Sequence, residues 1–302
     1  MSVHEMAQKS PTEQAADRIG TPVDGVHVVG ALSPSRAGDF MTCPLLFRYR
    51  TIDRLPEPSS PEAVRGTVIH KVLEDLFDLP AADRTRERAA DLLVPAWDAV
   101  LEADPAIAEM FGTEGPAVGD WLAGCRQVLD RYFELEDPQR LEPAERELYV
   151  ETLTDSRLLL RGIVDRIDVA PDGAIRLVDY KSGSSPGEAF EAKALFQMKF
   201  YALVIWRTRG VLPSMLQLIY LGNVEVLRYV PDESDLLATE RKVEALWRAI
   251  ALARETGDWR PRRSRMCDWC AHRAICPEWG GTPPPLPEVG EAAELLEVEP
   301  DE

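Results

Sequence analysis

The chain has 302 residues, with 34 lysines and arginines against 52 aspartates and glutamates, and a formal net charge of −18. This length accommodates one large domain with a substantial core, or two small ones. No stretch approaches the roughly 18 apolar residues of a membrane span, and the polar N-terminus lacks the apolar core of a signal peptide, which indicates a cytoplasmic protein. The negative charge argues against nucleic acid as a partner, because phosphate binding draws on lysine and arginine.

The distribution of the charge weakens that objection. From Glu288 to the C-terminus there are seven acidic residues and no basic ones, after a proline-rich stretch at 283–287. We therefore predict disordered tails over 1–27 and 281–302, and one domain over 28–280. Near the end of that domain, arginines cluster around Trp259 and Trp269, a pattern that suits either nucleic-acid binding or a solvated basic loop. These arginines are Arg260, Arg262, Arg263, Arg265 and Arg273.

The first half of the predicted domain is helical. Ser35 is placed as the N-cap of the first helix. His70 and Glu74 lie one turn apart on a polar face of the second helix, whose other face is apolar. The predicted helices cover residues 36–41, 63–79 and, with a break near 112–115, 85–136.

The middle of the chain alternates strands and helices. Helices are predicted over 188–209 and 234–256, the latter with Ser234 as N-cap. Together the elements indicate a mixed α/β domain whose sheet is covered by helices. The predicted strands are 146–153, 157–169, 174–181, 215–221 and 224–230.

Two of these strands form a predicted hairpin. The loop 171–173 reads Pro-Asp-Gly, with glycine where a positive φ is needed, so Ala170 pairs with Ala174. Counting back along this register sets Asp165 opposite Asp179.

Lys181 lies two residues beyond Asp179, on the same face of the strand. Opposed carboxylates repel, so a pair within apolar strands suggests a bound divalent cation. With His70 they make a set that suits Mg²⁺ or Mn²⁺, and a water deprotonated with help from Lys181 could attack a phosphodiester. The alternative is plain ion pairing, with Lys181 paired to Asp179 and with Asp165 and Asp168 paired to Arg161 and Arg166.

The cysteines form a second set. Cys267, Cys270 and Cys276 are spaced C-x2-C-x5-C, and Cys43 lies far earlier, before a proline. Clustered cysteines in a cytoplasmic protein favour metal over disulfides, as either a zinc site or an iron-sulfur cluster. Such a site would join the two ends of the domain. Cys125 instead falls on the apolar face of a helix and is predicted to pack in the core.

Gln197 and Tyr201 lie one helical turn apart, shortly after Lys181. They could hold a substrate strand by hydrogen bonding and stacking, or be ordinary surface and core residues.

In this order, the motifs resemble the RecB-type nucleases of the PD-(D/E)XK superfamily, in particular the subset with an iron-sulfur cluster. The resemblance spans about residues 31–280. The motifs are Leu32-Ser33 to Cys43-Pro44, Gly66 with His70 and Glu74, Gly162 to Asp168, Asp179 to Gly183, Gln197 with Tyr201, and the late cysteines.

The resemblance implies a restriction-endonuclease-like fold, with a mixed central sheet flanked by helices, a helical N-terminal part and a C-terminal cysteine region. It implies that His70, Asp165 and Asp179 bind the metal and that Lys181 assists catalysis. It also implies DNA binding by Gln197 and Tyr201, and a [4Fe-4S] cluster, mainly structural, on the four cysteines Cys43, Cys267, Cys270 and Cys276.

The expected function is a Mg²⁺- or Mn²⁺-dependent DNA exonuclease that prefers single-stranded or free ends, in DNA repair or recombination. No G-x-x-x-x-G-K-[ST] loop occurs, so unwinding would come from a helicase partner. The alternatives are a CRISPR-associated RecB-type nuclease and a non-catalytic DNA-binding module of a larger helicase-nuclease complex.

Overall fold

The structure is a computed structural model that describes residues 28–111, 118–185 and 188–287. The predicted tail 1–27, the last 15 residues of the predicted C-terminal tail and the predicted helix break near 112–115 lie outside these ranges. The chain divides into two compact units. The first unit is Met1–Glu57, Tyr149–Gly162 and Leu237–Glu302, and the second unit is Pro58–Leu148 and Ile163–Leu236.

The fold contains a six-stranded mixed sheet. Five strands follow the order β1-β3-β4-β5-β6, and the sixth, β2, also pairs with β3. The β1–β3 and β4–β5 pairs are parallel, while β3–β4 and β5–β6 are antiparallel. The strands are β1 (Gly30–Leu32), β2 (Glu145–Leu153), β3 (Leu158–Val169), β4 (Ile175–Lys181), β5 (Met215–Tyr220) and β6 (Glu225–Tyr229).

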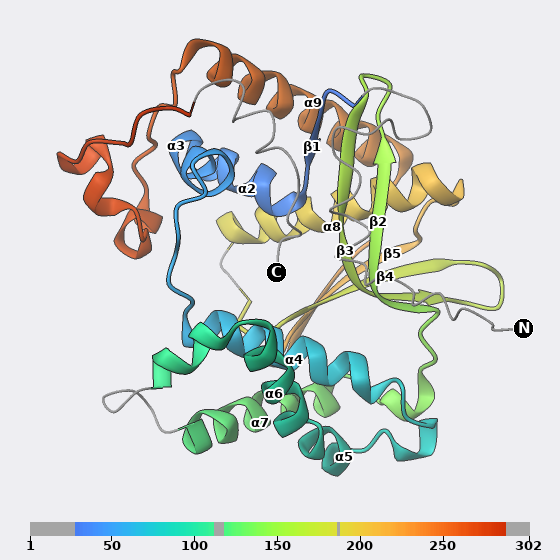
Figure 1. The fold of residues 1–302 in the computed structure, drawn as a ribbon. Coiled ribbons are helices and arrows are strands. Elements are labelled where there is room, and N and C mark those ends of the chain that lie inside the picture. Colours follow the sequence, from blue (N-terminus) through green and yellow to red (C-terminus); the bar gives the residue numbers. More distant parts are fainter. Residues whose placement is uncertain (1–27, 112–117, 186–187, 288–302) are drawn as a thin grey trace, which may run out of the picture. The chain divides into compact units, whose positions relative to one another are not determined.

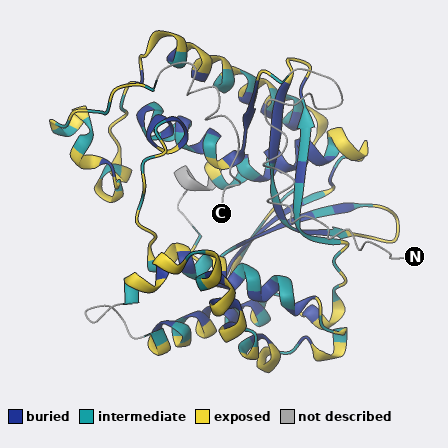
Figure 2. Ribbon diagram, in the orientation of Figure 1, coloured by how far each residue is buried: buried dark blue, intermediate teal, exposed yellow. Residues whose placement is uncertain are grey.

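In the second unit, helices cover both faces of β4 and β5 (Figure 1). One face carries Val178, Tyr180 and Ile219, which share an apolar cluster with the helices α4 (Pro61–Leu76), α5 (Arg86–Asp91), α6 (Leu93–Ala103) and α7 (Val118–Leu135). Cys125 of α7 is fully buried there, as predicted. Helix α8 (Glu188–Arg209) contacts β4 and β5 from the other face. The buried sides of α4 and α7 turn toward these strands, while their outer sides are exposed (Figure 2). The predicted mixed α/β fold is confirmed.

The first unit contains the N-terminal helices and most of the last long helix. The close approach of β1 to helix α9 (Glu233–Thr256) requires glycine at position 30, because a Cβ there would lie 2.1 Å from the Trp247 ring. The helical elements of the first unit are α2 (Pro34–Thr42), α3 (Pro44–Phe47), a π-helical turn at Arg48–Ile52, most of α9, and the 3₁₀ turns Arg265–Trp269, Arg273–Ile275 and Pro277–Trp279.

Two predicted N-caps are wrong by two residues. Ser33, not Ser35, caps α2, because Pro34 occupies the first helical position and the Ser33 hydroxyl accepts from the Arg36 N–H. Helix α9 begins before Ser234, and the Asp232 carboxylate accepts from the Asp235 N–H at 2.8 Å. A carboxylate at that position also complements the positive end of the helix dipole.

The predicted hairpin is confirmed. Gly173 has a φ of +87°, and the Ala170 N–H donates to the Ala174 carbonyl at 2.9 Å. The strands then pair in the predicted register from Val169↔Ile175 to Arg166↔Val178. Among the described residues, no helix combines the length and apolar character that crossing a membrane would take.

Candidate metal centre and cysteine cluster

The β3–β4 ladder opens where the candidate site lies. One step beyond Arg166↔Val178, the register sets Asp165 opposite Asp179, and a regular ladder would then direct the Tyr180 N–H to the Val164 carbonyl. Instead, the Tyr180 N–H donates to Oδ2 of Asp165 at 2.7 Å. The Asp165 carboxylate is thereby fixed beside the end of β4.

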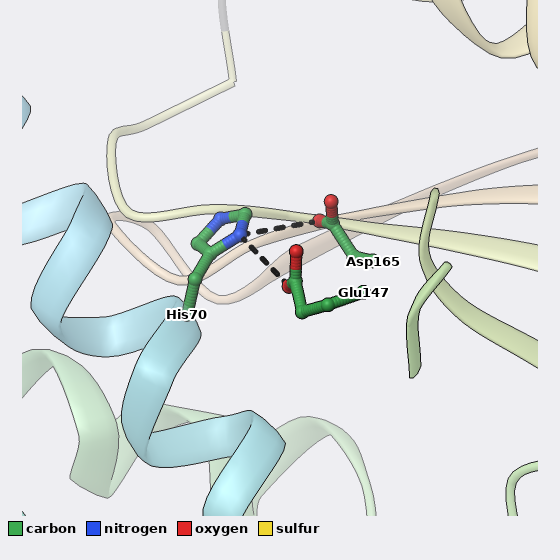
Figure 3. A group of neighbouring side chains, drawn as sticks. All are labelled: His70, Glu147 and Asp165. Atoms are coloured by element: carbon green, nitrogen blue, oxygen red, sulfur yellow. Dashed lines mark ion pairs between the residues drawn. The ribbon is translucent and has the colours of Figure 1, made fainter. Parts of the chain in front are cut away.

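His70 of α4 reaches the same place. Its Nε2 lies 2.9 Å from the Tyr180 carbonyl oxygen, a contact that orients the ring. Its Nδ1 lies 3.6 Å from Oδ2 of Asp165 and 3.7 Å from Oε1 of Glu147 (Figure 3). Ligand atoms of His70, Glu147 and Asp165 all lie within 4.8 Å of one another. This set of one imidazole and two carboxylates suits Mg²⁺ or Mn²⁺.

Glu147 is the site residue that sequence reasoning missed. It lies in β2 with a φ of +41°, in the left-handed region that side chains rarely adopt. Backbone strain of this kind gathers at functional sites. No spacing in the sequence links Glu147 to His70, and its one signal is a carboxylate within a predicted strand.

Asp179 and Lys181 lie next to each other on one face of β4, as predicted. The Lys181 Nζ lies 3.1 Å from Oδ1 and 2.8 Å from Oδ2 of Asp179, which is 2 % exposed. Burial, opposed by Lys181 and reinforced by the charge of Asp165, raises the pKa of Asp179 to about 6. Asp179 pairs with Lys181 and is outside the group of three formed by His70, Glu147 and Asp165 among the described residues.

The site as a whole attracts positive charge. Burial opposes a charged imidazole, but the carboxylates of Asp165 and Glu147 outweigh it and raise the pKa of His70 to about 9. Burial likewise opposes the charge of Lys181, and Asp179 outweighs it, so the pKa of Lys181 is also raised. A cation that binds here would displace the proton from His70.

The ion-pairing alternative holds for only one of the two β3 aspartates. Asp168 pairs with Arg166 and Arg176, at 3.1 and 2.8 Å. Asp165 faces His70 and accepts from the Tyr180 backbone.

Gln197 and Tyr201 lie on α8 beside Lys181. Oε1 of Gln197 accepts from the Lys181 Nζ at 3.1 Å, and its Nε2 donates to the Tyr201 hydroxyl at 3.3 Å. Tyr201 is buried. This geometry directs Gln197 toward Lys181, while the predicted substrate contacts of both residues stay a prediction.

The four predicted cysteine ligands come together in the first unit. They line one cavity of about 50 Å³, which Tyr49 and Met266 also line. The backbone N–H groups of Arg262 and Ser264 donate to the sulfurs of Cys43 and Cys267, at 3.3 and 3.4 Å.

Comparisons with known proteins identify the family of this chain and support its fold. Residues 31–277 match the sequence model of the PD-(D/E)XK nuclease superfamily. The gene 69 protein of Mycobacterium phage D29 is 28 % identical over 201 residues, 59 % of this chain and 70 % of that protein. An ATP-dependent helicase/deoxyribonuclease subunit from Streptococcus equi subsp. zooepidemicus is 30 % identical over 132 residues, which cover 43 % of this chain and 12 % of that longer protein. A crystal structure of a candidate exonuclease from Eubacterium rectale shares the fold, with a TM-score of 0.56, 13 % identity, and coverage of 91 % of this chain and 95 % of that one.

Proposed function

Since the chain belongs to the PD-(D/E)XK nuclease superfamily, we propose that it is a Mg²⁺- or Mn²⁺-dependent DNA exonuclease of the RecB type, acting on free ends in DNA repair or recombination. The observation that carries this proposal is the convergence of His70, Glu147 and Asp165 beside the Asp179–Lys181 pair. The relative named a deoxyribonuclease supports DNA as the substrate, and the helicase in its name supports a separate helicase as partner.

In this proposal, His70, Glu147 and Asp165 hold the metal, and Asp179 adjoins them. When bound, the metal activates a water and stabilises the charge that develops on the phosphate. The Lys181 Nζ donates to Asp179 and Gln197, and the carboxylates of Asp179 and Asp165 raise its pKa against the effect of burial, which favours the ammonium form. Its role is therefore to orient the attacking water and to offset negative charge in the transition state, rather than to remove a proton.

The test of this function is digestion of end-labelled DNA. Linear single strands, linear duplexes and closed single-stranded circles are incubated with Mg²⁺, Mn²⁺ or EDTA. We expect the linear DNA to be degraded from its ends with either metal, the circles to persist, and EDTA to stop the reaction. Cutting of circles as fast as linear DNA would overturn the exonuclease assignment, and intact DNA under every condition would overturn the nuclease itself.

We also propose that the cysteine cavity holds a [4Fe-4S] cluster. A zinc ion with Zn–S distances near 2.3 Å would bring its sulfurs within about 3.8 Å of one another. Within the described parts of the chain, however, no three cysteine sulfurs lie within 4.8 Å of each other. Four cysteines that line one cavity, with the sulfurs of Cys43 and Cys267 each accepting a backbone N–H, suit a larger cluster.

Replacing Cys43 by Ser is expected to remove the cluster and destabilise the first unit. Anaerobically purified protein should be brown, with broad visible absorption, and Cys43→Ser should lose this absorption. By analogy with a disulfide that closes so long a loop, the loss of stability is on the order of 5 kcal/mol. Cys125→Ala, which changes a core cysteine, should keep the absorption. Colourless protein with stoichiometric zinc would contradict the cluster while leaving the cysteine site intact.

A further inference from the structure

The segment 259–281, which carries three of the cysteines, presents an aromatic and basic surface that the proposed catalytic site does not use. Trp269 is 77 % exposed, the largest exposed fraction of any bulky apolar residue in the described ranges, and Met266 beside it is 43 % exposed. This segment lies at the red end of the chain in Figure 1, and most of its residues are exposed (Figure 2). An indole so far exposed in water costs free energy unless a partner covers it.

Trp269 lies in a short helical turn beside the cysteines, not in an irregular loop. It ends the 3₁₀ turn Arg265–Trp269, between Cys267 and Cys270, whose sulfurs line the cysteine cavity. The Ser264 side chain caps this turn through the Met266 N–H at 3.2 Å. The ring is thus presented to solvent from a backbone that is fixed on both sides.

The segment that carries this ring has an excess of positive charge. The segment 259–281 carries five arginines and only two acidic residues, in a chain whose net charge is −18. The guanidinium groups of Arg263 and Arg273 lie 4.5 and 3.7 Å from the centre of the Trp279 ring, so their positions are set by stacking. Arg265 is exposed as well.

We propose that this surface binds single-stranded DNA, with an unpaired base stacked on Trp269 and the arginines on the flanking phosphates. A flat exposed indole stacks on any base, while arginines track the backbone, so binding would be independent of sequence. A protein partner with an acidic surface is the competing occupant, and it would not require an aromatic base. The proposal deepens the proposed nuclease function and rests on DNA being the substrate.

The test measures binding without cleavage, in the full-length protein carrying Asp179→Asn. Fluorescence anisotropy measures the affinity for two labelled 20-mers of equal charge, which are oligo-dT and a strand of abasic residues. Each strand is titrated with the Asp179→Asn protein and with the Asp179→Asn/Trp269→Ala protein. We expect removal of the bases to weaken binding about 10-fold when Trp269 is present and less than 2-fold in Trp269→Ala. An equal loss in both proteins would overturn the proposal. Leu252→Ala, at an exposed apolar residue of α9, is the matched control and should behave like the parent.

A second pair of variants guards against a fold defect in Trp269→Ala. Trp269→Phe keeps an aromatic ring and Trp269→Leu does not, so the Trp269→Phe protein should bind oligo-dT several-fold more tightly than the Trp269→Leu protein. Equal affinities of the two variants would overturn the proposal. Arg265→Gln should lower the slope of log affinity against log salt by about 0.7. Because no turnover is measured, loss of stacking is distinguishable from failure of the nuclease function, which end-labelled digestion tests separately.

Discussion

Asp179→Asn is expected to lower DNA cleavage by at least about 10³-fold, while the protein stays folded. The carboxylate adjoins the proposed metal ligands and holds the Lys181 ammonium at 2.8 Å, so its loss removes a negative charge from the site and releases Lys181. The rate is measured with end-labelled DNA and saturating Mn²⁺.

The folded state provides the control for this variant. Because the pKa of Asp179 is raised to about 6, its ionised form is disfavoured by folding, and this group contributes stability below pH 4 that is lost as the pH rises through 6. At pH 8 without metal, Asp179→Asn should therefore unfold at a temperature no lower than the parent. Retention of full cleavage by a folded Asp179→Asn protein would refute the catalytic assignment.

Arg166→Met is expected to destabilise the protein by about 3–5 kcal/mol, because it leaves buried carboxylates without their counterion. The Arg166 side chain is 1 % exposed, and its Nη1 and Nη2 donate to Glu136 at 2.7 and 2.9 Å. It also pairs with Asp168 and donates to the Tyr180 hydroxyl. Urea unfolding measures the change.

Two further variants separate this buried network from ordinary surface pairing. Arg176→Met removes the half-exposed partner of Asp168 and should cost no more than about 1 kcal/mol. The double variant Arg166→Met/Glu136→Leu should recover part of the loss, since an apolar pair of similar volume avoids the desolvation of charge. A loss below about 1 kcal/mol for Arg166→Met would contradict the expected cost of leaving these buried carboxylates without a counterion.

Local chemistry in the sequence was sufficient to predict the hairpin. A Pro-Asp-Gly turn sets its register, and the period of two along a strand then places Lys181 beside Asp179. The same holds for the helix of His70, whose apolar face is read from spacing within one element. The wrong N-caps at Ser35 and Ser234 also have local causes. Pro34 starts helix α2 one residue after Ser33, and the Asp232 carboxylate accepts from the Asp235 N–H at the start of α9.

The sequence by itself determined strands β2 to β6, the long helices and the residue types at the site, because each depends on neighbours within a few positions. It did not predict the three-residue strand β1, which exists through its pairing with the distant β3. Only the tertiary structure decided that Glu147 joins His70 and Asp165, that the β3–β4 ladder opens at Tyr180, and that Gln197 faces Lys181. These features depend on how separate elements pack, and on a positive φ at Glu147 that no residue preference predicts. The gathering of the four cysteines around one cavity is of the same kind, since Cys43 lies far from the other three in the sequence and packing brings them together.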